Sequence, residues 1–409
     1  MKLNNCRLCG ADRLTQFLDL GYAPPADAFL TAERLSEPET YYPLRVVRCD
    51  ECHFIQLDYV VPPDVLYTVD YPYESSMTRA GKAHFSRFAR SIVNRFAVSK
   101  GELAVDIGSN VGVLLGGFKE QGLRIQGVDP AANIAKIANA DGVPTIPQFF
   151  SADVARQILY DQGAARIITG TNVFAHIHDL TSLMQAVDGL LAPNGIFVVE
   201  APYFVHLLEE NEFDTIYHEH LSYISITPLI PFFRKCGFEL IGVERHGIHG
   251  GSIRLLVGRL GAMPVEPSVD SFVREEKAKS IYSLETLGQF SGRVEANRRA
   301  LRHLLMSLKD QGKRIAGVSA PAKGMTLLNY CGFGREVLDF VTEKSRLKIG
   351  RYTPGRHIPV KPDSALIEEG IDVALLLAWN FKEEIMENLS EFRKRGGQFI
   401  VPVPTPELI

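Results

Sequence analysis

The stretch that decides the fold is Leu103-Ala104-Val105-Asp106-Ile107-Gly108-Ser109-Asn110-Val111-Gly112. Its first half is typical of a buried strand, and its glycines predict a tight turn into a helix. Such a turn lets the backbone approach a ligand at the carboxyl end of a parallel sheet. The G-x-x-x-G spacing differs from the G-x-G-x-x-G expected of a loop that holds a pyrophosphate. The stretch therefore indicates an α/β domain whose ligand is not a dinucleotide.

Two carboxylates near this loop indicate which ligand it binds. Asp106 precedes the first glycine, where it would repel a diphosphate but suit a cation, and Asp129 follows the next strand, where it can accept both hydroxyls of a ribose. Together they favour S-adenosylmethionine, a nucleoside with a sulfonium group. The alternative is a plain strand–helix turn in which Asp106 caps the helix. The residues expected to bind the cofactor are Asp106, Gly108, Asn110, Gly112, Asp129 and Asn172.

Outward from the loop, strands and helices alternate, which predicts a parallel, doubly wound sheet. A helix is expected at 80–98, parallel strands at 103–107, 124–128, 166–169 and 195–200, and an antiparallel edge hairpin at 239–245 and 252–257. After a charged, helix-prone connector at 268–309, strands at 314–318, 337–341, 373–377 and 398–401 predict a second α/β unit. The expected domains are 1–72, 73–265 and 266–409.

Composition excludes several classes of protein. The chain has 409 residues, a net charge of -4 and 46% apolar residues. This composition excludes intrinsic disorder and a disulfide-dense scaffold, and the chain is too long for one hydrophobic core. The chain lacks the excess of basic residues that would favour binding to nucleic acid. The start, MKLNNCRLCG, does not resemble a signal peptide, and the longest uncharged apolar stretch, 221–233, is too short to span a bilayer. We expect a cytoplasmic monomer with neither nucleic acid nor membrane as partner.

Four of the six cysteines form two C-x-x-C pairs within the first 52 residues. Two such pairs can complete a tetrahedral shell around one zinc ion. The alternatives are two redox motifs or a pair of structural disulfides, which a cytosolic setting disfavours. A shell made only of cysteines leaves no open position, so the metal should stabilise the fold and take no part in chemistry. The expected ligands are Cys6, Cys9, Cys49 and Cys52.

Seven of the eleven histidines fall between His176 and His249. The segment Tyr217-His218-Glu219-His220 concentrates titratable groups, and on an extended or turn backbone both imidazoles would face one way. Its spacing lacks the i, i+4 pattern of zinc hydrolases. General acid–base catalysis is the reading that we favour, because an imidazole titrates near neutral pH and a carboxylate and a phenol adjoin it. The alternative is a polar network that closes one end of the sheet.

Two other regions predict a substrate site. The glycine-rich hairpin turn 246–252 and the end of the third strand point at the carboxyl edge of the sheet. In the C-terminal third, the helix start at 321–324 and the basic loop 348–359 suit a diphosphate, although a solvated basic loop is the alternative. The expected substrate-binding residues are His176, His249, Gly250, Ser252, Lys323, Lys348, Arg351, Tyr352 and His357.

Taken together, the motifs CxxC…CxxC, DIGSNVG, NVFAHIHD, YHEHLSY, HGGSIR and KIGRYTPGRHIP resemble the nucleotide-sugar C-methyltransferases of deoxysugar and branched-sugar biosynthesis. The resemblance covers nearly the whole chain. It implies a zinc module, a class I methyltransferase domain that binds S-adenosylmethionine and a C-terminal Rossmann-like domain. It also implies methylation at C3 of a 4-keto-6-deoxyhexose linked to dTDP or GDP. His220 would be the base, supported by Glu219, with Tyr217 and Tyr71 near the keto group.

Two other functions remain open from the residues. An O- or N-methyltransferase would need a base but no stabilised enolate. A zinc-bearing scaffold with a degenerate methyltransferase fold would need neither.

Overall fold

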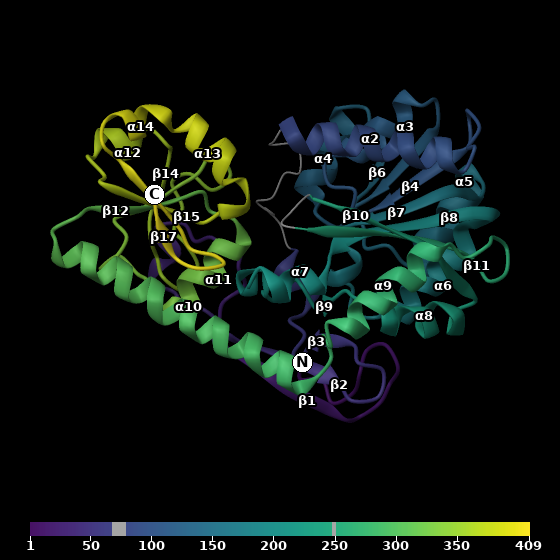
Figure 1. Ribbon diagram of the computed structural model, residues 1–409. Coiled ribbons are helices and arrows are strands. Elements are labelled where there is room, and N and C mark those ends of the chain that lie inside the picture. Colours follow the sequence, from purple (N-terminus) through teal and green to yellow (C-terminus); the bar gives the residue numbers. More distant parts are fainter. Residues whose placement is uncertain (68–78, 248–250) are drawn as a thin grey trace.

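The computed structural model describes residues 1–67, 79–247 and 251–409. Three sheets organise these residues: a four-stranded sheet near the N-terminus, a seven-stranded sheet in the middle of the chain and a six-stranded sheet near the C-terminus (Figure 1). The two larger sheets lie side by side, and the small sheet lies below them in this view (Figure 1). The predicted α/β class is confirmed.

The seven-stranded sheet contains the glycine-rich stretch that decides the fold. Its order is β10 (Phe238–His246), β11 (Ser252–Arg259), β8 (Leu191–Pro202), β7 (Ala165–Thr171), β4 (Leu103–Ile107), β5 (Arg124–Val128) and β6 (Thr145–Ile146). The inner strands are parallel, whereas β11 is antiparallel to both β8 and β10. The five residues of β4 are all buried, as expected of a strand covered on both faces. The predicted sheet and its edge hairpin are therefore both present.

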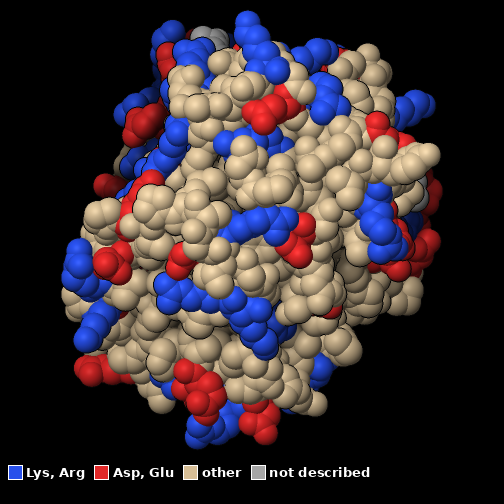
Figure 2. All heavy atoms as spheres, turned by 90° about the vertical axis from the view of Figure 1, so that its right-hand side faces the viewer, with Lys and Arg blue, Asp and Glu red and all other residues tan. Residues whose placement is uncertain are grey.

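Helices cover this sheet and short turns follow its strands. The helices are α2 (Arg79–Arg95), α3 (Val113–Glu120), α4 (Ala132–Ala140), α5 (Ala152–Gln162), α6 (Leu180–Leu190) and α8 (Ile226–Lys235). The shorter elements are η2 (Phe174–His176), α7 (Phe204–Glu209) and η3 (Phe213–Thr215). On the face of the molecule that carries this sheet, acidic and basic side chains are interspersed (Figure 2).

The six-stranded sheet forms the second α/β unit. Its order is β14 (Val360–Lys361), β13 (Val341–Thr342), β12 (Ile315–Val318), β15 (Val373–Leu376), β16 (Gln398–Val401) and β17 (Glu407–Leu408). Its helical elements are α11 (Ala322–Cys331), α12 (Ala365–Glu368), η5 (Trp379–Phe381), α13 (Lys382–Asn388) and α14 (Ser390–Lys394). The strand predicted at 337–341 is wrong in extent, because Val337 and Leu338 both donate backbone hydrogen bonds to the Gly334 carbonyl in a turn.

The connector is two helices where one helix-prone stretch was expected. They are α9 (Pro267–Ala278) and α10 (Leu284–Asp310), and Ser283 caps the second one by accepting a hydrogen bond from the Thr286 amide. Glu276 of α9 is fully buried and accepts bonds from the amides of Ile226 and Thr227 at the start of α8. In Figure 1, α9 lies with the middle unit, while α10 runs below the C-terminal unit toward the small sheet.

The small sheet joins the N-terminal module to the middle of the chain. Its strands are β1 (Leu14–Ala23), β2 (Tyr42–Cys49), β3 (Ile55–Leu57) and β9 (Ser222–Tyr223). Two short elements flank them, η1 (Glu33–Ser36) and α1 (Pro63–Leu66). Because β9 directly follows the histidine-rich segment, the pairing of Gln56 with Ser222 fixes that segment against the module.

Candidate active site

The loop after β4 has the backbone that its glycines predict. Gly108 and Gly112 have φ angles of +66° and +82°, and Asn110 is also left-handed at +49°. A Cβ atom at position 108 would lie 2.2 Å from Cγ2 of Val173. Gly112 precedes α3 and provides no side-chain cap, so the alternative in which Asp106 caps this helix is wrong. The loop is thus a cradle that a side chain would fill, and such a cradle fits a ligand that needs close backbone approach.

Asp129 ties this loop to the end of β5. Its Oδ2 accepts a hydrogen bond from the Asn110 amide at 2.9 Å, and its Oδ1 accepts one from the Ala131 amide at 2.9 Å. Burial raises the pKa of the Asp129 carboxyl above its ordinary value despite these bonds. Each carboxylate oxygen has a second lone pair, so the group can still accept a hydrogen bond from a ribose hydroxyl.

Two other polar groups meet at the same edge of the sheet. Asp106 is buried, accepts a 2.6 Å bond from the Thr169 hydroxyl, and has its pKa raised to about 7 by burial. A nearby cation would favour the charged form of this carboxyl. Asn172, left-handed at φ +55°, has a buried Oδ1 without a hydrogen-bond partner among the described residues. A buried unpaired acceptor is costly in an empty fold, so it fits a site that a polar ligand completes.

A second cluster holds the predicted catalytic histidine. Nδ1 of His220 lies 2.8 Å from the Thr215 carbonyl oxygen, and the rings of Tyr217 and His176 lie 3.9 and 4.9 Å away between centroids. Nδ1 of His176 in turn hydrogen-bonds the Tyr67 hydroxyl at 3.0 Å. Burial, followed by the proximity of His220, lowers the pKa of His176 well below its usual range. His176 is therefore neutral near pH 7.

Glu219 and His218 differ from His220 in their surroundings. Both carboxylate oxygens of Glu219 are buried without a hydrogen-bond partner among the described residues, and burial, followed by Asp27, raises its pKa to about 8. His218 lies with Nε2 3.3 Å from the Tyr42 carbonyl, and burial lowers its pKa to about 4. The expectation that both imidazoles face one way is wrong, because the His220 ring lies beside His176 and Tyr217 whereas the His218 ring lies beside Tyr42.

In the C-terminal unit, most of the predicted substrate residues contact acidic side chains or the N-terminal module. The Lys348 ammonium is buried and lies 3.1 Å from Oδ1 of Asp27 and 2.8 Å from the Ala320 carbonyl oxygen. Nε2 of His357 lies 2.6 Å from Glu39. The loop also pairs through the backbone of Tyr352 with Leu30, whereas Arg351 makes no side-chain hydrogen bond or ion pair with the described residues.

Lys323 lies at the border between the middle and C-terminal units. Its ammonium is 4.6 Å from the ring centre of Trp379, whose indole donates a 2.7 Å bond to Asp214. Burial, followed by the charge of Asp214, raises the pKa of Glu212 to about 7, and burial raises that of Asp214. Ser252 is buried at the start of β11. Tyr71, His249 and Gly250 lie outside the described residues.

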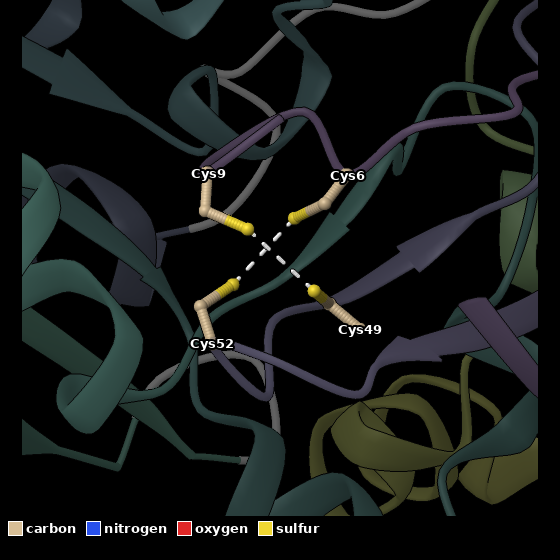
Figure 3. A group of neighbouring side chains, drawn as sticks. All are labelled: Cys6, Cys9, Cys49 and Cys52. Carbon is tan, nitrogen blue, oxygen red and sulfur yellow. Dashed lines mark hydrogen bonds between the residues drawn. The ribbon is translucent and has the colours of Figure 1, made fainter. Parts of the chain in front are cut away.

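The four cysteines of the N-terminal module converge. Their sulfur atoms all lie within 4.8 Å of one another, with Cys6 3.5 Å from Cys52 and Cys9 3.6 Å from Cys49 (Figure 3). None of them forms a disulfide, which removes the alternative of structural disulfides. Four thiolates at these separations fit the tetrahedral shell of a structural zinc ion. His53 does not join them and stacks on Tyr282.

Sequence reasoning missed Tyr67 and Thr215. Tyr67 lies in a proline- and tyrosine-rich linker without a recognisable motif, and Thr215 acts through its backbone carbonyl, which no side-chain pattern reveals.

Family models match three consecutive parts of the chain. They describe a zinc binding domain over residues 6–67, a methyltransferase domain over 82–243 and a C-methyltransferase C-terminal domain over 247–404. The cofactor loop and these matches define the class, an S-adenosylmethionine-dependent methyltransferase with a zinc-binding module. The chain is 39% identical over 408 residues to C-methyltransferase NovU of Streptomyces niveus, which covers 100% of this chain and 97% of that relative. The chain belongs to this C-methyltransferase family.

Other similarities are more distant. A ubiquinone biosynthesis O-methyltransferase of Cupriavidus pinatubonensis is 22% identical over 158 residues, covering 34% of this chain and 61% of that protein. Among solved structures, an S-adenosylmethionine-dependent methyltransferase from Clostridium acetobutylicum has a TM-score of 0.36 at 14% identity, covering 44% of this chain and 92% of that one. A magnesium protoporphyrin IX methyltransferase from Synechocystis has a TM-score of 0.35 at 14% identity, covering 46% and 90%.

The family matches, the relative from Streptomyces niveus and the four-cysteine cluster confirm the predicted enzyme class, the cofactor S-adenosylmethionine and the zinc-binding module, and they argue against a non-catalytic scaffold. Across the described ranges, no helix combines the length and apolar character needed to cross a membrane. The domain boundaries, the site residues, the partners and the cytoplasmic location stay predictions.

Proposed function

We propose that this C-methyltransferase adds a methyl group to C3 of a 4-keto-6-deoxyhexose linked to dTDP or GDP, through an enolate, in branched-sugar biosynthesis. The observation that carries the proposal is the 2.8 Å contact between Nδ1 of His220 and the Thr215 carbonyl oxygen. A carbonyl oxygen can only accept, so the contact with Thr215 places the proton of the neutral ring on Nδ1. The lone pair then lies on Nε2, where it can act as a general base.

His176 has the complementary tautomer in this proposal. If the Tyr67 hydroxyl donates to Nδ1 of His176, the proton of the neutral His176 ring lies on Nε2. One imidazole then accepts a proton while its neighbour offers one to a developing negative charge. A carbon next to a ketone needs both, a base for its proton and a donor for the enolate oxygen.

The steps on the sugar follow from these roles. Nε2 of His220 takes the C3 proton, and the electron pair of the C–H bond moves into an enolate whose O4 oxygen is held by His176, Tyr217 and Tyr71. S-adenosylmethionine, when bound at the loop after β4, supplies the electrophilic methyl group. We assign Glu219 to the support of His220 as the base. Because burial raises the pKa of Glu219 to about 8, this residue adds little charge next to His220 at pH 7.

The nucleotide part of the substrate would bind in the C-terminal unit. We assign the diphosphate to Lys323, at the start of α11, and to Arg351, whose side chain makes no hydrogen bond or ion pair with the described residues. Lys348, Tyr352 and His357 hold their loop against the N-terminal module and so shape this side of the site. Ser252, His249 and Gly250 would contact the sugar. The proposal includes a cytoplasmic enzyme that works as a monomer.

The test is the position of the new methyl group. The zinc-loaded enzyme is incubated with nucleotide 4-keto-6-deoxyhexoses and S-adenosylmethionine carrying a ¹³C methyl group. Carbon NMR of the product should show the label bonded to a quaternary or tertiary sugar carbon at position 3. A label bonded to oxygen or nitrogen, or no transfer to any 4-keto sugar nucleotide, would contradict the proposal.

A further inference from the structure

Arg7 lies between the zinc ligands Cys6 and Cys9, yet its guanidinium reaches two segments outside the metal module. Nε donates to the His178 carbonyl oxygen at 3.0 Å, and Nη2 donates to the Ile177 carbonyl oxygen. Nη1 donates to the Leu221 carbonyl oxygen at 2.9 Å and to the Ser222 hydroxyl at 2.8 Å. One planar side chain therefore joins the segment after η2 to the segment before β9.

These two segments carry the histidines of the candidate active site. Ile177 and His178 directly follow His176, and Leu221 directly follows His220. The imidazole rings of His176 and His220 lie 4.9 Å apart between centroids. The distance between the two rings thus depends on two backbone segments that the same guanidinium holds.

Arg7 is itself fixed at its backbone end. Its neighbours Cys6 and Cys9 belong to the four-cysteine cluster, and its amide donates to Oε1 of the buried Gln56 at 2.8 Å. Gln56 is the register partner of Ser222, so the same strand pair anchors both ends of the contact. A guanidinium presents its donors in a rigid fork, which suits it to hold several carbonyls in one geometry.

We propose that Arg7 is a positioning residue for catalysis, which transmits the geometry of the metal knuckle to His176 and His220 and so sets their separation. The proposal rests on the proposed roles of these two histidines. A displacement of about 1 Å between catalytic groups can lower a rate about 100-fold. The contrasting possibility is that Arg7 only stabilises the contact between the module and the middle unit, in which case the rate constant of the folded enzyme would not depend on it.

The test uses the full-length, zinc-loaded enzyme and the variants Arg7→Lys and Arg13→Lys. Arg13 is an exposed residue of the same module that pairs with Glu51, so R13K is the matched control. We expect R7K to keep its zinc and to bind S-adenosylmethionine within twofold of the wild type. Its kcat should fall at least about 30-fold with KM for the sugar nucleotide within threefold, because one ammonium cannot hold all four acceptors. A zinc-loaded R7K with kcat within threefold of the wild type would overturn the proposal.

A readout without substrate separates this inference from the proposed function. Amide hydrogen exchange, followed by mass spectrometry, should be faster in R7K for residues 174–180 and 217–223, and unchanged there in R13K. If the wild type methylates no sugar carbon, the proposed function fails. Amide hydrogen exchange would still show whether Arg7 holds the two segments in place. If neither segment exchanges faster in R7K, Arg7 does not hold the two segments, and the proposal fails even if the kcat of R7K is low.

If R7K loses its zinc, Ser222→Ala tests whether Arg7 positions the two histidines. This variant removes one acceptor of Arg7 and leaves the cysteine module untouched. We expect kcat to fall about threefold to tenfold with zinc content and cofactor affinity unchanged. An S222A enzyme whose kcat equals that of the wild type would overturn the proposal.

Discussion

The two α/β units have a similar backbone arrangement in the loops that follow β4 and β12. In each, a non-glycine residue of the following loop is left-handed, Asn110 in the first unit and Ser319 in the second. In each, a carboxylate after the neighbouring strand accepts a loop amide. Asp129 accepts from Asn110 at 2.9 Å, and Glu343 accepts from Ala320 at 3.1 Å. The two loops thus present similar backbone at the carboxyl edges of their sheets.

The side chains around the two loops differ in charge, because the second loop has lysines as well as carboxylates: Asp27 pairs with Lys348, and Asp214 lies near Lys323. The first loop has Asp106 below it and the unpaired Oδ1 of Asn172 beside it. The second loop has the ammonium of Lys348 on the Ala320 carbonyl and begins the helix that carries Lys323. Similar backbone can therefore bind a cationic nucleoside in one unit and, as we propose, an anionic nucleotide in the other. The charged side chains next to each loop determine which ligand it binds.

The largest expected effect on the stability of the fold concerns the backbone of the first loop. In Gly108→Ala the new Cβ would overlap Val173 at a left-handed φ, which should lower the free energy of unfolding by about 3 kcal/mol. The control is Gly350→Ala, since Gly350 has a φ of +83° but no atom of the described residues within 4 Å of its Cβ position, and this change should cost about 1 kcal/mol. Urea titrations of both variants measure the difference. Equal losses would contradict the idea that close packing requires Gly108.

Removing the carboxylates of Asp129 and Glu343 one at a time should show that each loop binds a different ligand. Asp129→Ala should weaken binding of S-adenosylmethionine about 100-fold, since it removes the acceptor of the Asn110 and Ala131 amides together with the proposed ribose acceptor. Glu343→Ala should leave that affinity within twofold and raise KM for the sugar nucleotide. Calorimetric titration gives the first quantity and steady-state kinetics the second. If both variants lost cofactor affinity alike, the two loops would not serve separate ligands.

A substitution of Lys323 tests whether the C-terminal unit binds the diphosphate. Lys323→Met should raise KM for the sugar nucleotide about 10- to 30-fold, because it removes a charged contact to the diphosphate. The exposed Lys344, on the loop after β13, provides the control variant K344M, whose KM should change less than twofold. Unchanged KM in K323M, or a loss of cofactor affinity, would place the diphosphate elsewhere.

The pH dependence of cofactor binding tests the acidic side. The pKa of Asp106 is raised from 3.8 to about 7, so the folded protein binds this proton more tightly than the unfolded chain does. Stability from this group is therefore full below pH 3.8 and falls as the pH rises toward 7. A cationic ligand prefers the charged carboxylate, so affinity for S-adenosylmethionine should rise about tenfold between about pH 6 and 7.5.

Asp106→Asn should abolish most of that rise. S-adenosylhomocysteine lacks the sulfonium charge and should show a smaller rise with the wild type. A steep rise that persists in D106N would assign the titration to another group.

The sequence predicted best those elements that local patterns specify. The mostly apolar run of β4 and the glycines after it were sufficient, because all five residues of β4 are buried and glycine readily adopts the left-handed φ at positions 108 and 112. The run 337–341 misled because a buried turn and a buried strand have the same apolar composition. The connector was read as one stretch because the helix start at Ser283 carries only a weak capping signal.

The site was harder to predict where contacts join distant parts of the chain. Asp27 and Glu39 lie more than 300 residues before their partners Lys348 and His357, so no spacing rule could indicate that these cations contact the N-terminal module. The Thr215 carbonyl that fixes His220 is a backbone atom and carries no sequence signal. Local motifs thus indicated which residues carry chemistry, and tertiary contacts determine how these residues are held.

Exchange of the C3 proton for solvent deuterium is the most direct measurement of the central claim. A nucleotide 4-keto-6-deoxyhexose is incubated in D₂O with the zinc-loaded wild type or His220→Asn, without methyl donor, and C3 is followed by proton NMR. The wild type should exchange the proton, and H220N should do so at least about 1,000-fold more slowly while it binds S-adenosylmethionine with nearly unchanged affinity. No exchange by the wild type, or equal exchange by H220N, would contradict catalysis through an enolate formed by His220.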